Sequence, residues 1–251
     1  MVNVRDPKVL FGVGVLGAFA LLALTGSERN GASAFVVPAI IPGPSSGPVK
    51  WTAHLSDAFF RAIDNLALDF RSKGAGVVGE DFLGVLNAES GVGPQAKNRL
   101  SGCAGMNQIC PTLKNDSLSG LKGVGWTGSR EEYLALSAEQ QLPFVARWFT
   151  SAASGKFPAL TNMGRLYLLN IAPAHATKAD DFPIYVKGRD GDAYTFNASL
   201  DQEGKGFISV RDCDKFVHRS LAGGPKGSRP FEYWSELQMR LNRVRQGQGN
   251  V

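Results

Sequence analysis

Residue types that build metal centres are scarce in this chain of 251 residues, which contains three cysteines and three histidines. No set of cysteines and histidines has the spacing of zinc ligands, so we predict no metal at the functional centre. The chain also lacks a repeat with a period of about 20 to 50 residues, which excludes solenoids and propellers. No helix-turn-helix, zinc-finger or RNA-recognition pattern is present, so no specific binding of nucleic acid is indicated.

Two of the three cysteines, Cys103 and Cys110, bracket a glycine-rich segment and could pair across a hairpin. The sequence does not establish the geometry that a disulfide needs. Two buried thiols that fill small apolar positions are the favoured interpretation, and Cys213 is unpaired in either case.

Positive charge is in excess, with a formal net charge of +5, and residues 211–251 hold much of that excess. A basic surface suits a polyanionic partner, although a solvated basic tail is an equally good interpretation. The hydrophobic content of 43% and the charged fraction of 20% are those of a globular protein.

The chain divides into four segments by composition. Residues 1–29 contain the uncharged run Val9–Ser27, whose length is at the lower end for a transmembrane helix. We interpret it as a retained anchor helix; a signal peptide cleaved after Ala32-Ser33-Ala34 and a helix buried in an assembly are the alternatives. Residues 30–50 contain four prolines and form an extended linker.

The predicted domain, residues 51–186, is mainly helical. Ser56 is a good N-cap for a helix that runs to about Arg71 with an apolar stripe from Phe59 to Phe70. Further helices are predicted over 129–136, 138–152 and 160–172, and the glycine-rich residues 101–127 suit a loop or a small hairpin.

The fourth segment, residues 187–251, is predicted to be a C-terminal appendage. Asp201 to Asp212 reads DQEGKGFISVRD, which has acids at positions 1, 3 and 12 of a calcium loop and glycine at position 6. Lys205 stands where an oxygen ligand is needed, so we expect a degenerate EF-hand-like turn without a calcium role. The helix Glu232–Arg245 is expected to pack on the domain or on a partner.

One glutamate interrupts an apolar helical stripe. Phe82, Val85, Leu86 and Glu89 are spaced i, i+3, i+4 and i+7, so they share one face of a short helix. A carboxyl group on a core-facing stripe is partly desolvated, which raises its pKa and lets it serve as a proton donor. By spacing alone, a glutamate that faces solvent at the end of the helix is the favoured interpretation.

The motifs around this glutamate change that interpretation. Glu89-Ser90-Gly91 and the segment SGCAGMNQICP at 101–111 resemble the signature of lytic transglycosylases of the goose-lysozyme-like superfamily. The segment LSAEQQL at 136–142 is similar to the start of the helix that follows the active-site hairpin in that family. YLLNIAP at 167–173 is similar to its Tyr-Asn motif, and the resemblance covers roughly residues 55–186.

The chain departs from the family pattern at two places: Met106-Asn107 replaces Leu-Met before Gln108, and the Tyr-Asn pair is split into Tyr167 and Asn170. The resemblance implies an α+β lysozyme-like fold and one catalytic residue, Glu89, with neither a metal nor an organic cofactor. The substrate-binding residues that it implies are Ser90, Met106, Asn107, Gln108, Tyr167 and Asn170. Capping of a turn by Ser90, and packing by Gln108 and Tyr167, are the structural alternatives.

The activity that the resemblance implies is cleavage of the bond between N-acetylmuramic acid and N-acetylglucosamine in peptidoglycan, with formation of a 1,6-anhydro end. The implied partners are the glycan strands, and a membrane or a virion assembly that holds residues 9–27. The pattern looks most like phage virion-associated enzymes that open the cell wall during genome entry. A membrane-anchored enzyme of a bacterial secretion or conjugation system is the alternative setting.

Two other classes of function remain open. A hydrolytic lysozyme would use water and a second carboxylate, for which Asp180 or Asp181 is available, although a solvated turn is the better interpretation of that pair. A non-catalytic structural protein would keep only the fold, and the intact Glu89 and Gln108 argue against it.

Overall fold

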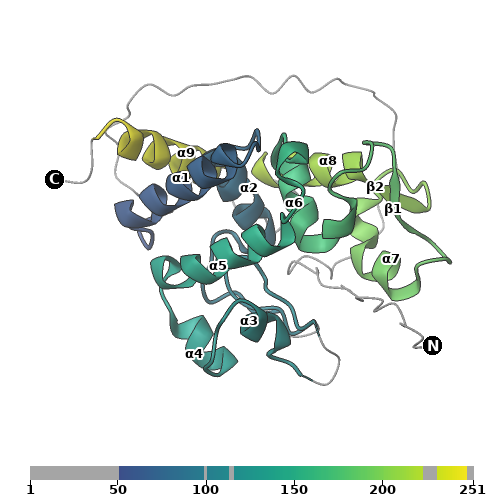
Figure 1. The fold of residues 1–251 in the computed structure, drawn as a ribbon, viewed down its shortest axis with the longest axis horizontal. Coiled ribbons are helices and arrows are strands. Elements are labelled where there is room, and N and C mark those ends of the chain that lie inside the picture. Colours follow the sequence, from purple (N-terminus) through teal and green to yellow (C-terminus); the bar gives the residue numbers. More distant parts are fainter. Residues whose placement is uncertain (1–50, 99–100, 113–115, 223–230, 248–251) are drawn as a thin grey trace, which may run out of the picture.

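The computed structural model describes residues 51–98, 101–112, 116–222 and 231–247 (Figure 1). Over these ranges the protein is mainly helical, with nine α-helices, three short 3-10 helices and one two-stranded sheet. The helices are α1 Asp57–Ser72, α2 Gly79–Ser90, α3 Ser119–Gly123, α4 Arg130–Ala135, α5 Ala138–Ala152, α6 Met163–Ile171, α7 Gly191–Asn197, α8 Val210–Leu221 and α9 Phe231–Arg245. The 3-10 helices are Phe157–Ala159, Pro173–His175 and Ala198–Leu200, and the strands are β1 Pro183–Val186 and β2 Phe207–Ser209.

Side-chain caps set the beginnings of several helices. The Ser56 hydroxyl accepts a hydrogen bond from the backbone N–H of Phe59, so α1 begins where the sequence predicts, and its apolar stripe is buried. Helix α5 begins in the same way at Ser137, whose side chain accepts from Gln140. Helix α6 begins at residue 163 rather than near 160, because a 3-10 turn containing Pro158 precedes it and Asn162 caps it.

The main hydrophobic core lies between α1, α2, α5, α6, α8 and α9. Helices α2, α6 and α8 pack against one another in its centre, and α9 lies along α1 (Figure 1). A second, smaller cluster is formed by Ala104, Ile109, Leu121, Val124 and Tyr133, which come from the glycine-rich segment, α3 and α4. In Figure 1 these last elements form a lobe beside α5.

The described part of the predicted appendage, residues 187–222 and 231–247, shares the main core. Helix α8 packs against α2 and α6, and α9 packs on α1 and α2, which confirms packing of the last helix on the domain. Arg240 Nη2 lies 3.0 Å from Asp57 Oδ1, and Arg245 Nη2 lies 2.6 Å from Asp64 Oδ1. The core therefore continues across the predicted boundary between residues 186 and 187.

The sheet does not come from the glycine-rich segment. β1 pairs antiparallel with β2, with Val186 opposite Phe207. Over residues 101–112 and 116–127 the β structure consists of isolated bridges, such as Ala104 with Ile109, and α3 forms a short helix where the sequence predicts a loop or hairpin. The backbone φ is positive at Gly102, Gly105 and Gln108, which interrupts any extended run long enough for a strand.

No helix within the described ranges is long and apolar enough to cross a membrane. The predicted anchor Val9–Ser27 and the linker 30–50 lie outside the described residues.

Candidate active site

Glu89 lies at the end of α2, where the helix is closed by a left-handed glycine. Gly91 has φ 65°, and its backbone N–H donates to Asn87 O at 2.8 Å. Phe82, Val85 and Leu86 are fully buried, and Glu89 on the same stripe is 1% exposed. The alternative of a solvent-facing glutamate is therefore wrong, since the apolar stripe carries the carboxyl group into the core.

The two carboxyl oxygens of Glu89 differ in their surroundings. Oε1 accepts a hydrogen bond from Asn170 Nδ2 at 2.9 Å, whereas Oε2 is buried and has no hydrogen-bond partner among the described residues. Burial raises the pKa of Glu89 to about 8, although the bond from Asn170 acts in the opposite direction. Glu89 is therefore largely a protonated carboxylic acid at neutral pH.

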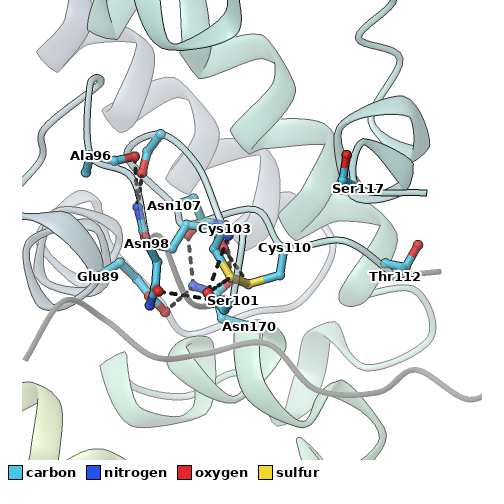
Figure 2. The surroundings of a disulfide bond; sticks show 12 residues. Glu89, Ala96, Asn98, Ser101, Cys103, Asn107, Cys110, Thr112, Ser117 and Asn170 are labelled. Atoms are coloured by element: carbon cyan, nitrogen blue, oxygen red, sulfur yellow. Dashed lines mark hydrogen bonds between the residues drawn. A yellow bond between two sulfur atoms is a disulfide. The ribbon is translucent and has the colours of Figure 1, made fainter. Parts of the chain in front are cut away.

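Asn170 connects Glu89 to a network of side chains (Figure 2). Its amide forms a reciprocal pair with Asn107: Asn170 Nδ2 donates to Asn107 Oδ1 at 2.9 Å, and Asn107 Nδ2 donates to Asn170 Oδ1 at 3.1 Å. The indole N–H of Trp148 on α5 also donates to Asn170 Oδ1, at 3.0 Å. The structure thus brings Glu89, Asn107 and Asn170 together from three separate segments.

Tyr167 lies one turn before Asn170 on α6 and is almost completely buried. Burial, and then the nearby charge of Glu89, raise the pKa of its hydroxyl well above the usual range. Its ring packs against Phe216, with ring centroids 5.5 Å apart. The split of the Tyr-Asn motif therefore keeps both side chains on one face of α6 and close to Glu89.

The remaining predicted site residues, Ser90, Met106 and Gln108, stabilise the loop at residues 101–111 rather than the Glu89 carboxyl group. The Ser90 hydroxyl donates to Met106 O at 2.7 Å and accepts from the N–H of Gly93, so it ties the end of α2 to the loop. Gln108 Nε2 donates to Gly105 O and Ala96 O, at 2.9 and 3.2 Å. Met106 and Gln108 are both buried, and Gln108 has φ 45°.

The prediction that Cys103 and Cys110 are separate thiols is wrong, because they form a disulfide that closes the base of this loop (Figure 2). The Ala104–Ile109 bridge just inside the pair brings the two backbones together. Cys213 is a buried free thiol. The disulfide and the Asn107–Asn170 pair therefore hold the same eight-residue loop at its base and at its tip.

Two residues that sequence reasoning missed support the site. Trp148 was not singled out, because a tryptophan 22 positions before Asn170 carries no local signal of contact. Gln141 belongs to the SAEQQL motif, and its Oε1 accepts from Met106 N at 3.1 Å while its Nε2 donates to Pro94 O and Tyr133 O. A Cβ on Gly105 would lie 2.6 Å from Gln141 Oε1, so the loop needs glycine at that position.

The acids proposed as a second carboxylate lie in a different environment. Asp180 pairs with Arg165 and its side chain is more than half exposed. Among the described residues, burial and the hydrogen bond from Asn170 cause the shift in the Glu89 pKa, and no carboxylate contributes.

In the loop that resembles a calcium site, residues 201–212, the side chain of Lys205 supplies a positive charge. Lys205 Nζ lies 2.9 Å from both carboxyl oxygens of Asp212, and Asp201 accepts hydrogen bonds from the backbone N–H groups of Lys205 and Gly206. Among the described residues, no group of three or more His, Cys, Asp or Glu side chains is arranged to hold a metal ion.

Comparisons with protein-family models, with curated proteins and with solved structures found no match to this chain. The resemblance to lytic transglycosylases therefore rests on the four motifs alone.

Proposed function

We propose that this protein is a peptidoglycan lytic transglycosylase in which Glu89 acts first as the acid and then as the base. The observation that carries the proposal is the state of the Glu89 carboxyl group. It is buried, its pKa is raised to about 8, and Oε2 is left without a partner among the described residues. A carboxylic acid kept protonated at neutral pH by an apolar site is the form that donates a proton in such reactions.

The reaction follows from one carboxyl group. Glu89 transfers its proton from Oε2 to the oxygen between N-acetylmuramic acid and N-acetylglucosamine, and the bond from that oxygen to C1 of the muramic acid breaks. The cationic sugar is attacked at C1 by its own C6 hydroxyl, whose proton returns to the Glu89 carboxylate. The products are a free N-acetylglucosamine end and a 1,6-anhydro end, and no water is consumed. Binding must bring the glycosidic oxygen within hydrogen-bond reach of Oε2.

The surroundings of Glu89 favour this route over hydrolysis with two carboxylates. Of the two acids available for a second role, Asp180 is engaged by Arg165 at an exposed position, and Asp181 is also exposed. An enzyme that depends on one carboxyl group needs that group to change between acid and base, for which a pKa near the working pH is favourable. The phage virion is the setting that we propose, on the strength of the sequence resemblance, and copurification with capsid or tail proteins would test it.

The test compares two changes of a carboxylate to an amide. Glu89→Gln keeps the shape and the hydrogen bond from Asn170 but cannot supply a proton, so it should lower glycan cleavage by about 10²–10⁴-fold while peptidoglycan binding is kept. Asp180→Asn should cleave at close to the wild-type rate. Mass spectrometry of wild-type digests should show muropeptides that end in 1,6-anhydro-N-acetylmuramic acid, lighter by one water than hydrolysed ends.

Each other outcome has a defined meaning. Reducing ends together with an inactive Asp180→Asn variant would indicate a hydrolytic lysozyme. Undiminished cleavage by Glu89→Gln would reject the assignment of the site.

A further inference from the structure

The pair of amides beside Glu89 can be arranged in two directions. Asn107 and Asn170 each donate to and accept from the other, with distances of 3.1 and 2.9 Å. Each side-chain amide presents two donors on nitrogen and an acceptor on oxygen. If both amides rotated by half a turn, their mutual hydrogen bonds would be kept. The pair alone therefore does not decide whether Asn170 shows an N–H or a carbonyl oxygen to Glu89.

Trp148 removes this ambiguity. An indole N–H can only donate, so the atom of Asn170 that it contacts at 3.0 Å has to be the carbonyl oxygen. The amide nitrogen of Asn170 is then directed to Glu89 Oε1, at 2.9 Å. Trp148 is itself held in place, because its partly buried ring packs against both hydrophobic clusters.

We propose that Trp148 is a positioning residue that fixes the direction of the Asn170 amide and so keeps the acidic proton of Glu89 on the oxygen that serves the substrate. With an N–H directed at Oε1, that oxygen has to act as an acceptor, and the proton resides on Oε2. If the amide turned over, its carbonyl oxygen would accept a hydrogen bond from a proton on Oε1, and that hydrogen bond would hold the proton away from the glycan. The proposal rests on the proposed function and assigns a residue outside the recognised motifs.

The other titratable groups at this position do not compete with Glu89. Tyr167 on α6 interacts electrostatically with Glu89 and with Cys213 on α8. Burial raises the pKa of both the hydroxyl and the thiol, so both stay neutral over the range in which Glu89 titrates. A change at Trp148 should therefore be visible in the titration of Glu89 alone.

The first experiment is a pair of matched tryptophan substitutions in the full chain. Trp148→Phe removes the indole N–H and keeps an aromatic ring. Trp126→Phe removes the same group from a partly buried tryptophan that donates to Ser129 O, away from Glu89. The carboxyl carbon of Glu89 is followed by NMR against pH, with Glu89→Gln identifying the signal.

In Trp148→Phe the protonated form of Glu89 gains a hydrogen-bond acceptor. Its titration midpoint should therefore rise by about 1 pH unit, and glycan cleavage at pH 7 should fall by about tenfold. The midpoint in Trp126→Phe should stay at the wild-type value. An unchanged midpoint in Trp148→Phe would overturn the proposal.

A second measurement needs no variant that might unfold. The Nε1–H of Trp148 in the wild-type protein should exchange with solvent much more slowly than an exposed indole, and exchange at the exposed rate would overturn the proposal. The titration requires no glycan, so a raised midpoint in a protein that cleaves nothing would reject the proposed function and keep this inference. An unchanged midpoint in Trp148→Phe, together with an active wild-type enzyme, would reject this inference and keep the proposed function.

Discussion

Two buried carboxyl groups in this molecule have opposite surroundings. Glu89 is 1% exposed and Asp212 is 3% exposed. Glu89 receives one neutral hydrogen bond, and burial raises its pKa to about 8. Burial also acts to raise the pKa of Asp212, but Lys205 and Ser209 outweigh it and the pKa is lowered. Two carboxyl groups with almost no exposed surface therefore have pKa values shifted in opposite directions, because Asp212 has a cation and several hydrogen-bond donors beside it and Glu89 has one neutral donor.

The largest expected effect is on the pH dependence of the unfolding free energy, compared between the wild type and Glu89→Gln. A raised folded pKa means that the folded protein binds a proton that the unfolded chain has released. The unfolding free energy of the wild type should therefore decrease between about pH 5 and pH 8, by on the order of 3–5 kcal/mol relative to Glu89→Gln. Denaturant titrations of both proteins at several pH values measure this. Parallel stability curves would show that Glu89 is not a buried acid.

The next largest expected effect concerns Asp212. Lys205→Met leaves Asp212 buried without its cation, so the unfolding free energy at pH 7 should fall by about 2–4 kcal/mol. The pKa of Asp212 is lowered in the folded protein, so this stabilisation is complete above the usual carboxyl range and is lost below about pH 4. The deficit of Lys205→Met should therefore shrink in acid. Lys215→Met, which removes an exposed pair with Glu203, is the control and should cost less than about 1 kcal/mol.

The disulfide closes the loop that carries Asn107, so its removal should affect the surroundings of Glu89 and not those of Asp212. Replacement of Cys103 and Cys110 by serine should lower the unfolding free energy by about 2–3 kcal/mol, because the unfolded chain gains loop freedom. Intact-mass analysis after alkylation in denaturant without reductant should show a single labelled cysteine, Cys213. Three labelled cysteines would show that the disulfide is absent.

The smallest effect expected is that of metal removal. Because Lys205 already neutralises Asp212, EDTA should change neither the melting temperature nor glycan cleavage. A calcium-dependent rise in melting temperature would show that the ion displaces the lysine.

Local signals in the sequence predicted α1, α2, α4, α5, α6 and α9, but not α3, α7 or α8. The stripe of α1 and the cap at Ser56 are patterns of neighbouring residues, and the structure confirms them. The spacing placed Glu89 on the same helical face as Phe82, Val85 and Leu86, but by itself it favoured a solvent-facing glutamate. The flanking motifs reversed that interpretation, and the structure buries all four residues. Such features depend on contacts within one or two turns of a helix.

The features that the sequence did not show depend on how separate segments meet. The bond from Trp148 to Asn170 needs α5 and α6 to pack in one particular register. The ion pair of Lys205 with Asp212 needs a loop that folds back on itself. The sequence predicted that Lys205 would oppose calcium binding, but not that it would pair with Asp212. The choice between a disulfide and two thiols depended on whether two backbones approach, which spacing alone does not reveal.

The hydroxyl of Tyr233 on α9 donates to Gly91 O, which ends the helix that carries Glu89, at 2.5 Å. Glu236 on the same helix accepts from the backbone N–H groups of Trp51 and Thr52. A ribosome delivers α9 after every other described element, so the nascent chain cannot make these bonds until α9 has been synthesised. The contacts also join residues more than 140 positions apart, and closing such long loops slows folding. The protein should therefore acquire its completed acid site only after α9 has been synthesised.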